Sequence, residues 1–357
     1  MIVVSRITLR RLDLPLVKPY RLSYRTFHTF EPYLVEVETE TGRVAHGVAH
    51  ISPGSSSETR EGGLAFLNSR LPHLIGLDVS QAKARLLEGF LESKVAATAA
   101  VTAFEILEDL PILARKTPST LPLLVPVGAL DRAGIEEEVE AAIEAGFRTL
   151  KVKVGKDADA DATRLGWIQE AVAGRAVLRV DANRAFDRDA AIAFVRQVDP
   201  EGIALFEQPC EADLWDDNAA VAAASDIPVM LDEPICTLAD IERAADIPGV
   251  AFCKVKLKRF GGVERLLEGI RHIQAHGMTA ILGDGLGCDL HAWLEACVAA
   301  ECIDNAGEFN GWLKLEDRLF KAPLRFGNGA MTLPAGPCPE LDSDRLEAAT
   351  TLTITYQ

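Results

Sequence analysis

The first sixty residues alternate apolar and polar side chains in short runs. The segments 6–16, 32–42 and 43–51 repeat with a period of two residues, which is typical of strands that bury one face. The last two segments flank Gly42 and predict a hairpin there. From about residue 58 to 117 the apolar positions recur at spacings of three and four, which indicates helices. Strands followed by helices predict an α+β unit over residues 1–120.

A different pattern begins with the sequence LLVPVGAL at residues 123–130. From there to about residue 325, short β-branched and aliphatic runs alternate with amphipathic helical segments. Such alternation requires a parallel sheet, and eight strands in this length favour a closed barrel of the (β/α) type. The seventh and eighth strands are predicted to end near Asp284 and Glu308. We therefore expect an α/β barrel over residues 121–325.

The last segment, residues 326–357, loses the alternation of strand and helix. We expect it to fold back on the N-terminal unit. The sequence thus predicts three parts: an α+β cap (1–120), a barrel (121–325) and a returning segment (326–357).

The composition is that of an ordinary globular protein, with 48% hydrophobic and 25% charged residues. The net charge of −16 argues against nucleic acid as a partner, because nucleic-acid binding needs clustered lysine and arginine. No apolar run is long enough to cross a bilayer, so no membrane association is expected. Seven cysteines without a CxxC pair, and an N-terminus without a signal peptide, favour the cytoplasm.

Five polar residues follow the apolar strands at nearly equal steps. From Lys151 the chain steps 30 residues to Asp181, 26 to Glu207, 25 to Asp232 and 24 to Lys256, each step being one strand, one helix and two loops. Active sites of such barrels lie at the carboxyl ends of the strands. Three neighbouring carboxylates repel one another unless a cation neutralises them, and oxygen ligands suit Mg²⁺ better than Zn²⁺. The three acids therefore predict a magnesium site.

Two lysines stand on the strand that precedes Asp181. Lys151 and Lys153 are two residues apart and point to one side, whereas Val152 and Val154 point to the other. Since helices must cover the outside of this strand, the lysines are predicted to face the site.

A second pair of lysines, Lys254 and Lys256, stands two residues apart on the sixth strand. Lys256 is nearer the rim and is the better candidate for a second proton carrier. Lys254 is expected one layer deeper, as a charge partner for the acids. Lys258 and Arg259 are predicted to lie in the following loop, in contact with solvent.

These groups suit the removal of a proton next to a carboxylate. Such a proton is very weakly acidic, and Mg²⁺ bound to the carboxylate stabilises the resulting enediolate. A lysine close to a metal ion and other cations has a lowered pKa and can act as the base. Lysines on the second and sixth strands can each serve one face of the carbon.

At this point the sequence resembles a known family, the enolase superfamily, and within it the muconate-lactonizing-enzyme subgroup. The resemblance implies a modified (β/α)7β barrel with an α+β cap. It also implies that the three acids bind Mg²⁺, that Lys153 is a base, that Lys151 assists and polarises the carboxylate, and that Lys256 is the opposite acid or base. The matching segments are KVKVG, VDANRAF, FEQP, LDEP and KLKRFGG.

Two strand ends depart from the subgroup. The seventh ends Asp284-Gly-Leu-Gly, and the eighth ends GEFNGWLK instead of the DxD pattern of dipeptide epimerases, which makes dipeptide epimerisation less expected. Asp284 and Glu308 are candidates to hold a substrate ammonium group, or equally to neutralise Lys254 or Lys256. Trp312 is a candidate to stack on a cationic substrate. The alternative is that Trp312 is simply a loop residue packed in the protein. Tyr20 and Tyr24 belong to a lid or to the core of the cap.

The leading hypothesis is racemisation or epimerisation of an amino acid derivative, because two opposed lysines allow proton removal on one face and delivery on the other. The close alternative is β-elimination or cycloisomerisation of a small carboxylate, as in a dehydratase, a succinylbenzoate synthase or a muconate enzyme. A Schiff-base aldolase using Lys153 or Lys256 leaves the acids unexplained, and a binding barrel without catalysis leaves the whole set unexplained. The expected partners are a small carboxylate substrate and further copies of the chain.

Overall fold

The cap is built on an antiparallel sheet. The computed structural model describes residues 1–357 except 22–25 and 55–56. The sheet has the order β16-β1-β4-β5, so the last strand of the chain pairs with the first. Strands β2 and β3 pair separately, in antiparallel orientation. The strands are β1 (Val4–Leu12), β2 (Leu14–Arg21), β3 (Thr26–Phe30), β4 (Tyr33–Thr39), β5 (Val44–Ala49) and β16 (Thr350–Tyr356).

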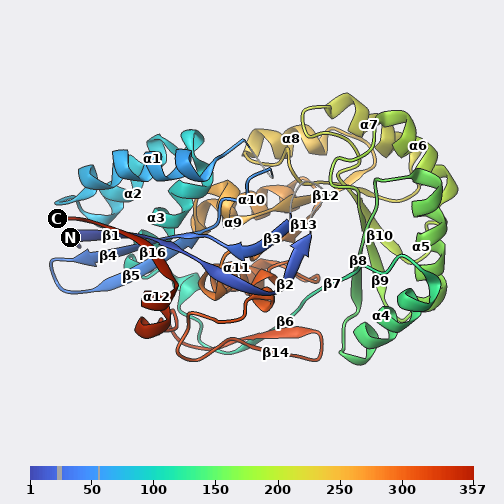
Figure 1. The fold of residues 1–357 in the computed structure, drawn as a ribbon. Helices are drawn as coiled ribbons and strands as arrows, with labels where there is room; N and C mark the ends of the chain where they lie inside the picture. The colour runs from blue at the N-terminus through green and yellow to red at the C-terminus, as the bar shows by residue number, and fades with distance from the viewer. Residues whose placement is uncertain (22–25, 55–56) are drawn as a thin grey trace.

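Helices cover one face of this sheet (Figure 1). The alanine-rich α3 packs closest, because Gly47 of β5 carries no side chain: a Cβ there would lie 2.2 Å from the carbonyl oxygen of Ala99. The cap helices are α1 (Arg60–Arg70), α2 (Val79–Glu88) and α3 (Lys94–Leu107), with 3₁₀ turns at η1 (Leu71–Leu74), η2 (Phe90–Glu92) and η3 (Pro111–Leu113).

The barrel consists of seven parallel strands that lie in chain order from β7 to β13, with helices on the outside (Figure 1). The strands are β7 (Val125–Val127), β8 (Thr149–Lys153), β9 (Val177–Asp181), β10 (Ile203–Glu207), β11 (Val229–Leu231), β12 (Val250–Val255) and β13 (Thr279–Leu282). The helices are α4 (Arg132–Glu144), α5 (Ala158–Val172), α6 (Arg188–Gln197), α7 (Trp215–Ala224), α8 (Leu238–Ala245), α9 (Leu257–Phe260), α10 (Val263–Ala275) and α11 (Asp289–Cys302).

The eighth barrel position is held by an irregular segment instead of a full strand. The amide of Gly307 donates to the carbonyl of Pro122 (2.9 Å), its carbonyl accepts from the amide of Leu124 (3.3 Å) directly before β7, and the amide of Glu308 donates to the carbonyl of Leu282 on β13 (2.8 Å). This segment therefore bonds to both edges of the sheet. The α/β architecture with a modified barrel and a cap is confirmed.

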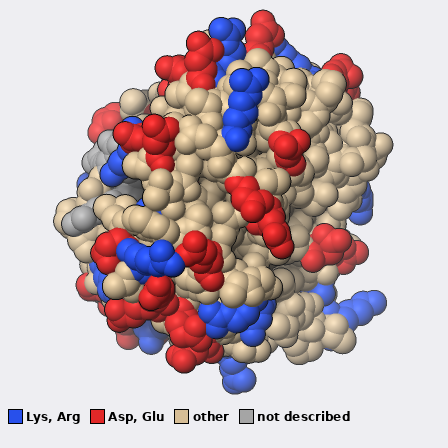
Figure 2. All heavy atoms as spheres, turned by 90° about the vertical axis from the view of Figure 1, so that its right-hand side faces the viewer, with Lys and Arg blue, Asp and Glu red and all other residues tan. Residues whose placement is uncertain are grey.

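The outer surface of the barrel carries charges of both signs among uncharged residues. Figure 2 shows acidic and basic side chains interspersed over this face rather than gathered by sign. No helix in the described parts of the chain is long and apolar enough to span a membrane.

The returning segment contacts both the barrel and the cap. Strand β15 pairs with β14 and β6, and β16 joins the cap sheet beside β1. The remaining elements are β6 (Ser119–Pro122), η4 (Gly311–Lys314), β14 (Arg325–Gly327), β15 (Ala330–Leu333) and α12 (Ser343–Ala349).

A buried carboxyl group joins the cap to the barrel. Glu105 of α3 accepts hydrogen bonds from the amides of Val263 (2.7 Å) and Glu264 (3.0 Å) at the start of α10. Burial raises the pKa of Glu105 to about 7, against the opposing effects of these hydrogen bonds and of Lys83. The negative charge of Glu264 adds to the increase.

Glu105 is expected to make stability depend on pH. Between about pH 4.5 and 7 the folded protein keeps a proton that the unfolded chain releases, so stability falls as pH rises through this window, by roughly 3 kcal/mol in all. In Glu105→Gln the share of this decrease that comes from Glu105 should disappear from urea denaturation curves recorded across the window, whereas Glu207, whose pKa is also raised to about 7 by burial, keeps its own share. The exposed Glu88→Gln is the control, and an unchanged slope in Glu105→Gln would contradict the assignment.

Candidate active site

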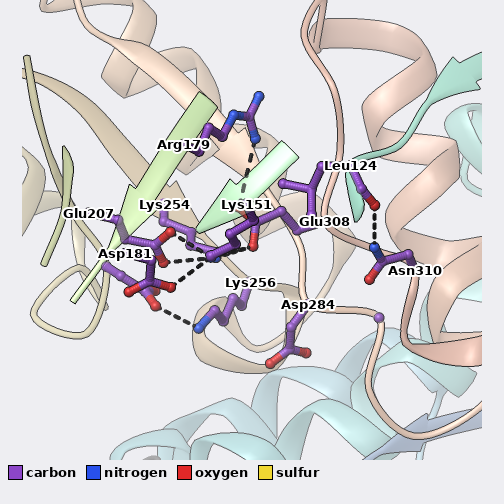
Figure 3. A network of polar contacts seen from close by, with 12 residues as sticks. Leu124, Lys151, Arg179, Asp181, Glu207, Lys254, Lys256, Asp284, Glu308 and Asn310 are labelled. Atoms are coloured by element: carbon purple, nitrogen blue, oxygen red, sulfur yellow. Dashed lines mark hydrogen bonds and ion pairs between the residues drawn. The ribbon is translucent and has the colours of Figure 1, made fainter. Parts of the chain in front are cut away.

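The predicted acids lie side by side at the carboxyl ends of neighbouring strands. In the ladders, Lys153 of β8 is opposite Asp181 of β9, and Asp181 is opposite Glu207 of β10. Asp232 and Lys256 directly follow β11 and β12. The equal spacing along the sequence therefore corresponds to neighbouring positions in space (Figure 3).

Each acid faces a lysine. Asp181 Oδ2 lies 2.8 Å from Lys151 Nζ and 2.6 Å from Lys153 Nζ. Glu207 lies 2.6 Å from Lys151 Nζ and 2.9 Å from Lys254 Nζ. These carboxylates are buried, so their charges are compensated inside the protein rather than by solvent.

The third acid is held by two cations. Asp232 lies 2.9 Å from Lys256 Nζ through one oxygen and 2.7 Å from Arg259 through the other. Burial alone would raise the pKa of Asp232, but the charges of Arg259 and Lys256 hold it well below its usual range. This carboxylate is therefore ionised at neutral pH.

Asp181 and Glu207 differ in their electrostatic state. The charges of Lys151 and Lys153 outweigh burial and hold the pKa of Asp181 well below its usual range. Burial, followed by the charge of Asp181, raises the pKa of Glu207 to about 7. A divalent cation bound beside Asp181 and Glu207 would favour the ionised form of Glu207.

The donor set fits a hard cation, although the carboxylates are turned toward lysines. Among the described residues, no group of three or more acids, histidines or cysteines is arranged to hold a metal ion. Each of the three acids nevertheless has an oxygen in contact with an ammonium group, a place that a cation could take. Oxygen-only ligands of this kind suit Mg²⁺.

The two proposed proton carriers differ in exposure. The side chain of Lys153 is 42% exposed and contacts Asp181 and the side-chain oxygen of Asn183. Lys256 is buried, and burial together with the charge of Arg259 lowers its pKa. The lysines come from β8 and from the end of β12, which are separated in the sheet by β9, β10 and β11.

Glu308 lies in a buried network and is already paired. Its carboxylate bonds to Lys254 and to Lys151 (2.9 Å), and Arg179 lies 3.7 Å away. Figure 3 shows these groups converging from β8, β9 and β12. Of the two sequence alternatives, this geometry agrees with neutralisation of Lys254 rather than with capture of a substrate ammonium group.

The prediction that Lys258 and Arg259 contact solvent was wrong. Both lie in α9, a helix of four residues that begins directly after Lys256. Lys258 is 4% exposed and pairs with Asp284 at 2.8 Å, while Arg259 pairs with Asp232. Leu257 and Phe260 pack α9 against the core. The side chains of Lys258 and Arg259 therefore point toward the strand ends rather than into solvent.

The aromatic candidates lie in different surroundings. Trp312 is fully buried, and the guanidinium of Arg318 lies 4.5 Å from its ring centre, so a cation already occupies one face. Tyr20 lies in β2, with Lys314 Nζ 4.9 Å from its ring centre. Tyr24 lies outside the described residues.

Comparison with known proteins identifies the family. Residues 134–337, more than half of the chain, match the family model described as enolase C-terminal domain-like. The chain belongs to this family. The L-Lys-D/L-Arg epimerase of Methylococcus capsulatus is 32% identical over 356 residues, covering 91% of this chain and 98% of the relative. Muconate cycloisomerase 1 of Rhodococcus opacus is 28% identical, covering 91% and 92%.

Solved structures of this family share the fold. The N-succinyl Arg/Lys racemase of Bacillus cereus superposes with a TM-score of 0.91 at 21% identity, over 99% of this chain and all of the other. A dipeptide epimerase of Methylococcus capsulatus, complexed with Mg and the dipeptide L-Arg-D-Lys, gives 0.83 at 26% identity, over 94% and 98%. The enolase-superfamily relatives of this chain are epimerases, racemases and cycloisomerases, which places it among isomerases or lyases.

Proposed function

We propose that this protein is a Mg²⁺-dependent racemase or epimerase of an amino acid derivative. The observation that carries the proposal is the arrangement of Lys153 and Lys256 on separated strands, on either side of the three carboxylates. Asp181, Glu207 and Asp232 would hold the metal ion. The ion would neutralise the charge that develops on the substrate carboxylate when the α-proton leaves.

The side chains of this chain divide the remaining work. Lys153 takes the α-proton from one face of the carbon and Lys256 delivers a proton to the other. Lys151 donates to the substrate carboxylate and is kept charged, because the charges of Asp181, Glu207 and Glu308 raise its pKa despite its burial. Lys254 is kept charged in the same way by Glu207 and Glu308.

A second candidate is cycloisomerisation or β-elimination, which the similarity to muconate cycloisomerase supports. In that case one lysine transfers the proton and the other has no matching role. The epimerase assignment is preferred because Lys153 contacts Asp181 and Lys256 contacts Asp232. Each lysine thus lies beside a candidate metal ligand, as expected if both transfer protons. A cytoplasmic location, supported by the seven free cysteines, and self-assembly complete the proposal.

The proposal predicts exchange of the α-proton with solvent. A panel of dipeptides and N-acyl amino acids, incubated in heavy water with Mg²⁺, should show deuterium at the α-carbon together with loss of optical purity. Chelation should stop the reaction and added Mg²⁺ should restore it. Asp232→Asn should reduce exchange by about 100-fold or more and weaken Mg²⁺ binding in calorimetry, because a ligand charge is lost.

The exposed Asp213→Asn serves as the matched control and should exchange at the wild-type rate. Formation of an alkene or a lactone without deuterium in recovered substrate would replace epimerisation by the second candidate. Full exchange after chelation would contradict the role of the metal.

A further inference from the structure

A lysine outside the predicted set lies close to the strand ends. Lys314 ends the turn η4, which follows the irregular eighth segment of the barrel. The turn is tied to the cap, because the amide of Glu316 donates to the carbonyl of Pro15 (3.0 Å) and Leu315 forms a bridge with Leu16. Lys314 therefore stands where the barrel end meets strand β2, beside the ring of Tyr20.

The acids whose charges act on Lys314 are already paired with other cations. Asp284 and Glu308 are the carboxylates that act on it, yet Asp284 pairs with Lys258 at 2.8 Å. Glu308 is bonded to the lysines of the buried network. In the part of the chain that the structure describes, no carboxylate lies within ion-pair distance of Lys314 Nζ.

Burial lowers the pKa of Lys314 to about 8, and the two acids oppose that change only in part. At neutral pH the side chain is still mostly protonated. A cation that is largely removed from water and has no paired acid is unfavourable unless something else compensates it. The aromatic face of Tyr20 supplies a weak contact of about 0.5–1 kcal/mol in exposed settings, less than a full charge requires.

The same region offers little to a positively charged ligand. Asn310 stands two residues after Glu308, and its amide nitrogen donates to the carbonyl of Leu124 (2.8 Å) (Figure 3). Of the acids described at this end of the barrel, Asp284 is paired with Lys258 and Glu308 with Lys151 and Lys254. An ammonium group placed here would meet Lys314 and Lys258 and only acids that are already paired.

We propose that Lys314 binds an anionic group at the far end of the substrate. The inference rests on the proposed function and specifies its substrate class: an N-acyl amino acid whose acyl arm ends in a carboxylate. In a dipeptide whose second residue changes configuration, the α-carboxylate belongs to that residue and the far end is an ammonium group. In a dicarboxylic N-acyl derivative the far end is a carboxylate, which Lys314 can pair with.

The experiment compares ligands that differ only at that end. N-succinyl amino acids, their terminal amides and the corresponding dipeptides are tested with the Mg²⁺-loaded enzyme, both for α-proton exchange and for binding by calorimetry. Wild type should favour the carboxylate over the amide by roughly 10- to 100-fold in kcat/KM, as expected for a charge-assisted hydrogen bond in a protected site. Lys314→Gln should reduce this preference at least tenfold, mainly through KM, and Lys314→Arg should retain most of it.

Lys321→Gln, an exposed lysine that pairs with Glu340, is the matched control and should keep the wild-type preference. An unchanged preference in Lys314→Gln, or a wild-type enzyme that favours the amide or the dipeptide, would overturn the inference and leave Lys314 as a packing partner of Tyr20. Binding that depends on Lys314 without exchange of any compound would support this subsite and refute the proposed epimerase instead.

Discussion

Replacing Lys256 by alanine is expected to abolish epimerisation while leaving α-proton exchange in one of the two stereoisomers. The reason is the placement of Lys153 and Lys256 on separated strands, which in the proposed function lets each lysine serve one face of the α-carbon. Loss of a general base costs about 10²- to 10⁴-fold in rate. Each stereoisomer is therefore incubated separately in heavy water, and deuterium incorporation is followed by NMR or mass spectrometry. Lys153→Ala should show the opposite pattern.

Two further variants separate proton transfer from charge. Lys256→Arg keeps a cation beside Asp232, but arginine does not release a proton at neutral pH. This variant should therefore lose epimerisation to the same extent as Lys256→Ala. Lys156→Ala removes an exposed lysine three residues beyond Lys153 and should behave as wild type. Loss of exchange in the same stereoisomer for both Lys153→Ala and Lys256→Ala would rule out two opposed bases and favour the one-base alternative.

The strand-end acids could be predicted because parallel strands convert sequence spacing into neighbouring positions. Asp181 and Glu207 are 26 residues apart in the chain and directly opposite in the ladder. The same reasoning with a period of two identified Lys151 and Lys153. The same reasoning would also have found Arg179. It stands two residues before Asp181, and its guanidinium lies 3.7 Å from the Glu308 carboxylate.

The missed residues belong to segments too short for a periodic signal. Helix α9 has four residues, so its sequence gave no hint that Lys258 and Arg259 turn back into the site. The eighth barrel position, which the sequence predicted to end near Glu308, forms only an isolated bridge between Gly307 and Leu123 instead of a full strand. In each case the tertiary contacts, rather than the local pattern, determine the structure.

The contact between Lys314 and Tyr20 had no sequence signal of any kind. The two residues lie almost three hundred positions apart, and the approach depends on the strand β2 of the cap crossing the end of the barrel. On the proposed function, substrate selectivity would depend on such contacts between cap and barrel, whereas the proposed proton-transfer groups come from the barrel alone. This division explains why the reaction class could be predicted and the substrate could not.

Glu308→Gln is expected to destabilise the protein by about 3–5 kcal/mol, because it removes the shared acid of a buried network and leaves Lys151, Lys254 and Arg179 under-compensated. The charges of these cations outweigh burial and hold the pKa of Glu308 well below its usual range, so the wild-type contribution should persist at mildly acidic pH. Urea denaturation of the variant measures the loss.

A double variant tests whether the loss comes from the unpaired cations. Removing Lys254 together with the acid, in Glu308→Gln/Lys254→Met, should recover part of the stability, since one uncompensated charge disappears with its partner. The exposed Glu316→Gln should be neutral. If Glu308→Gln is as stable as wild type, the carboxylate does not hold the network, and its place at the strand end would have to be explained by contact with substrate. The network interpretation thus predicts a coupling between Glu308 and Lys254 that a substrate-binding role for Glu308 does not.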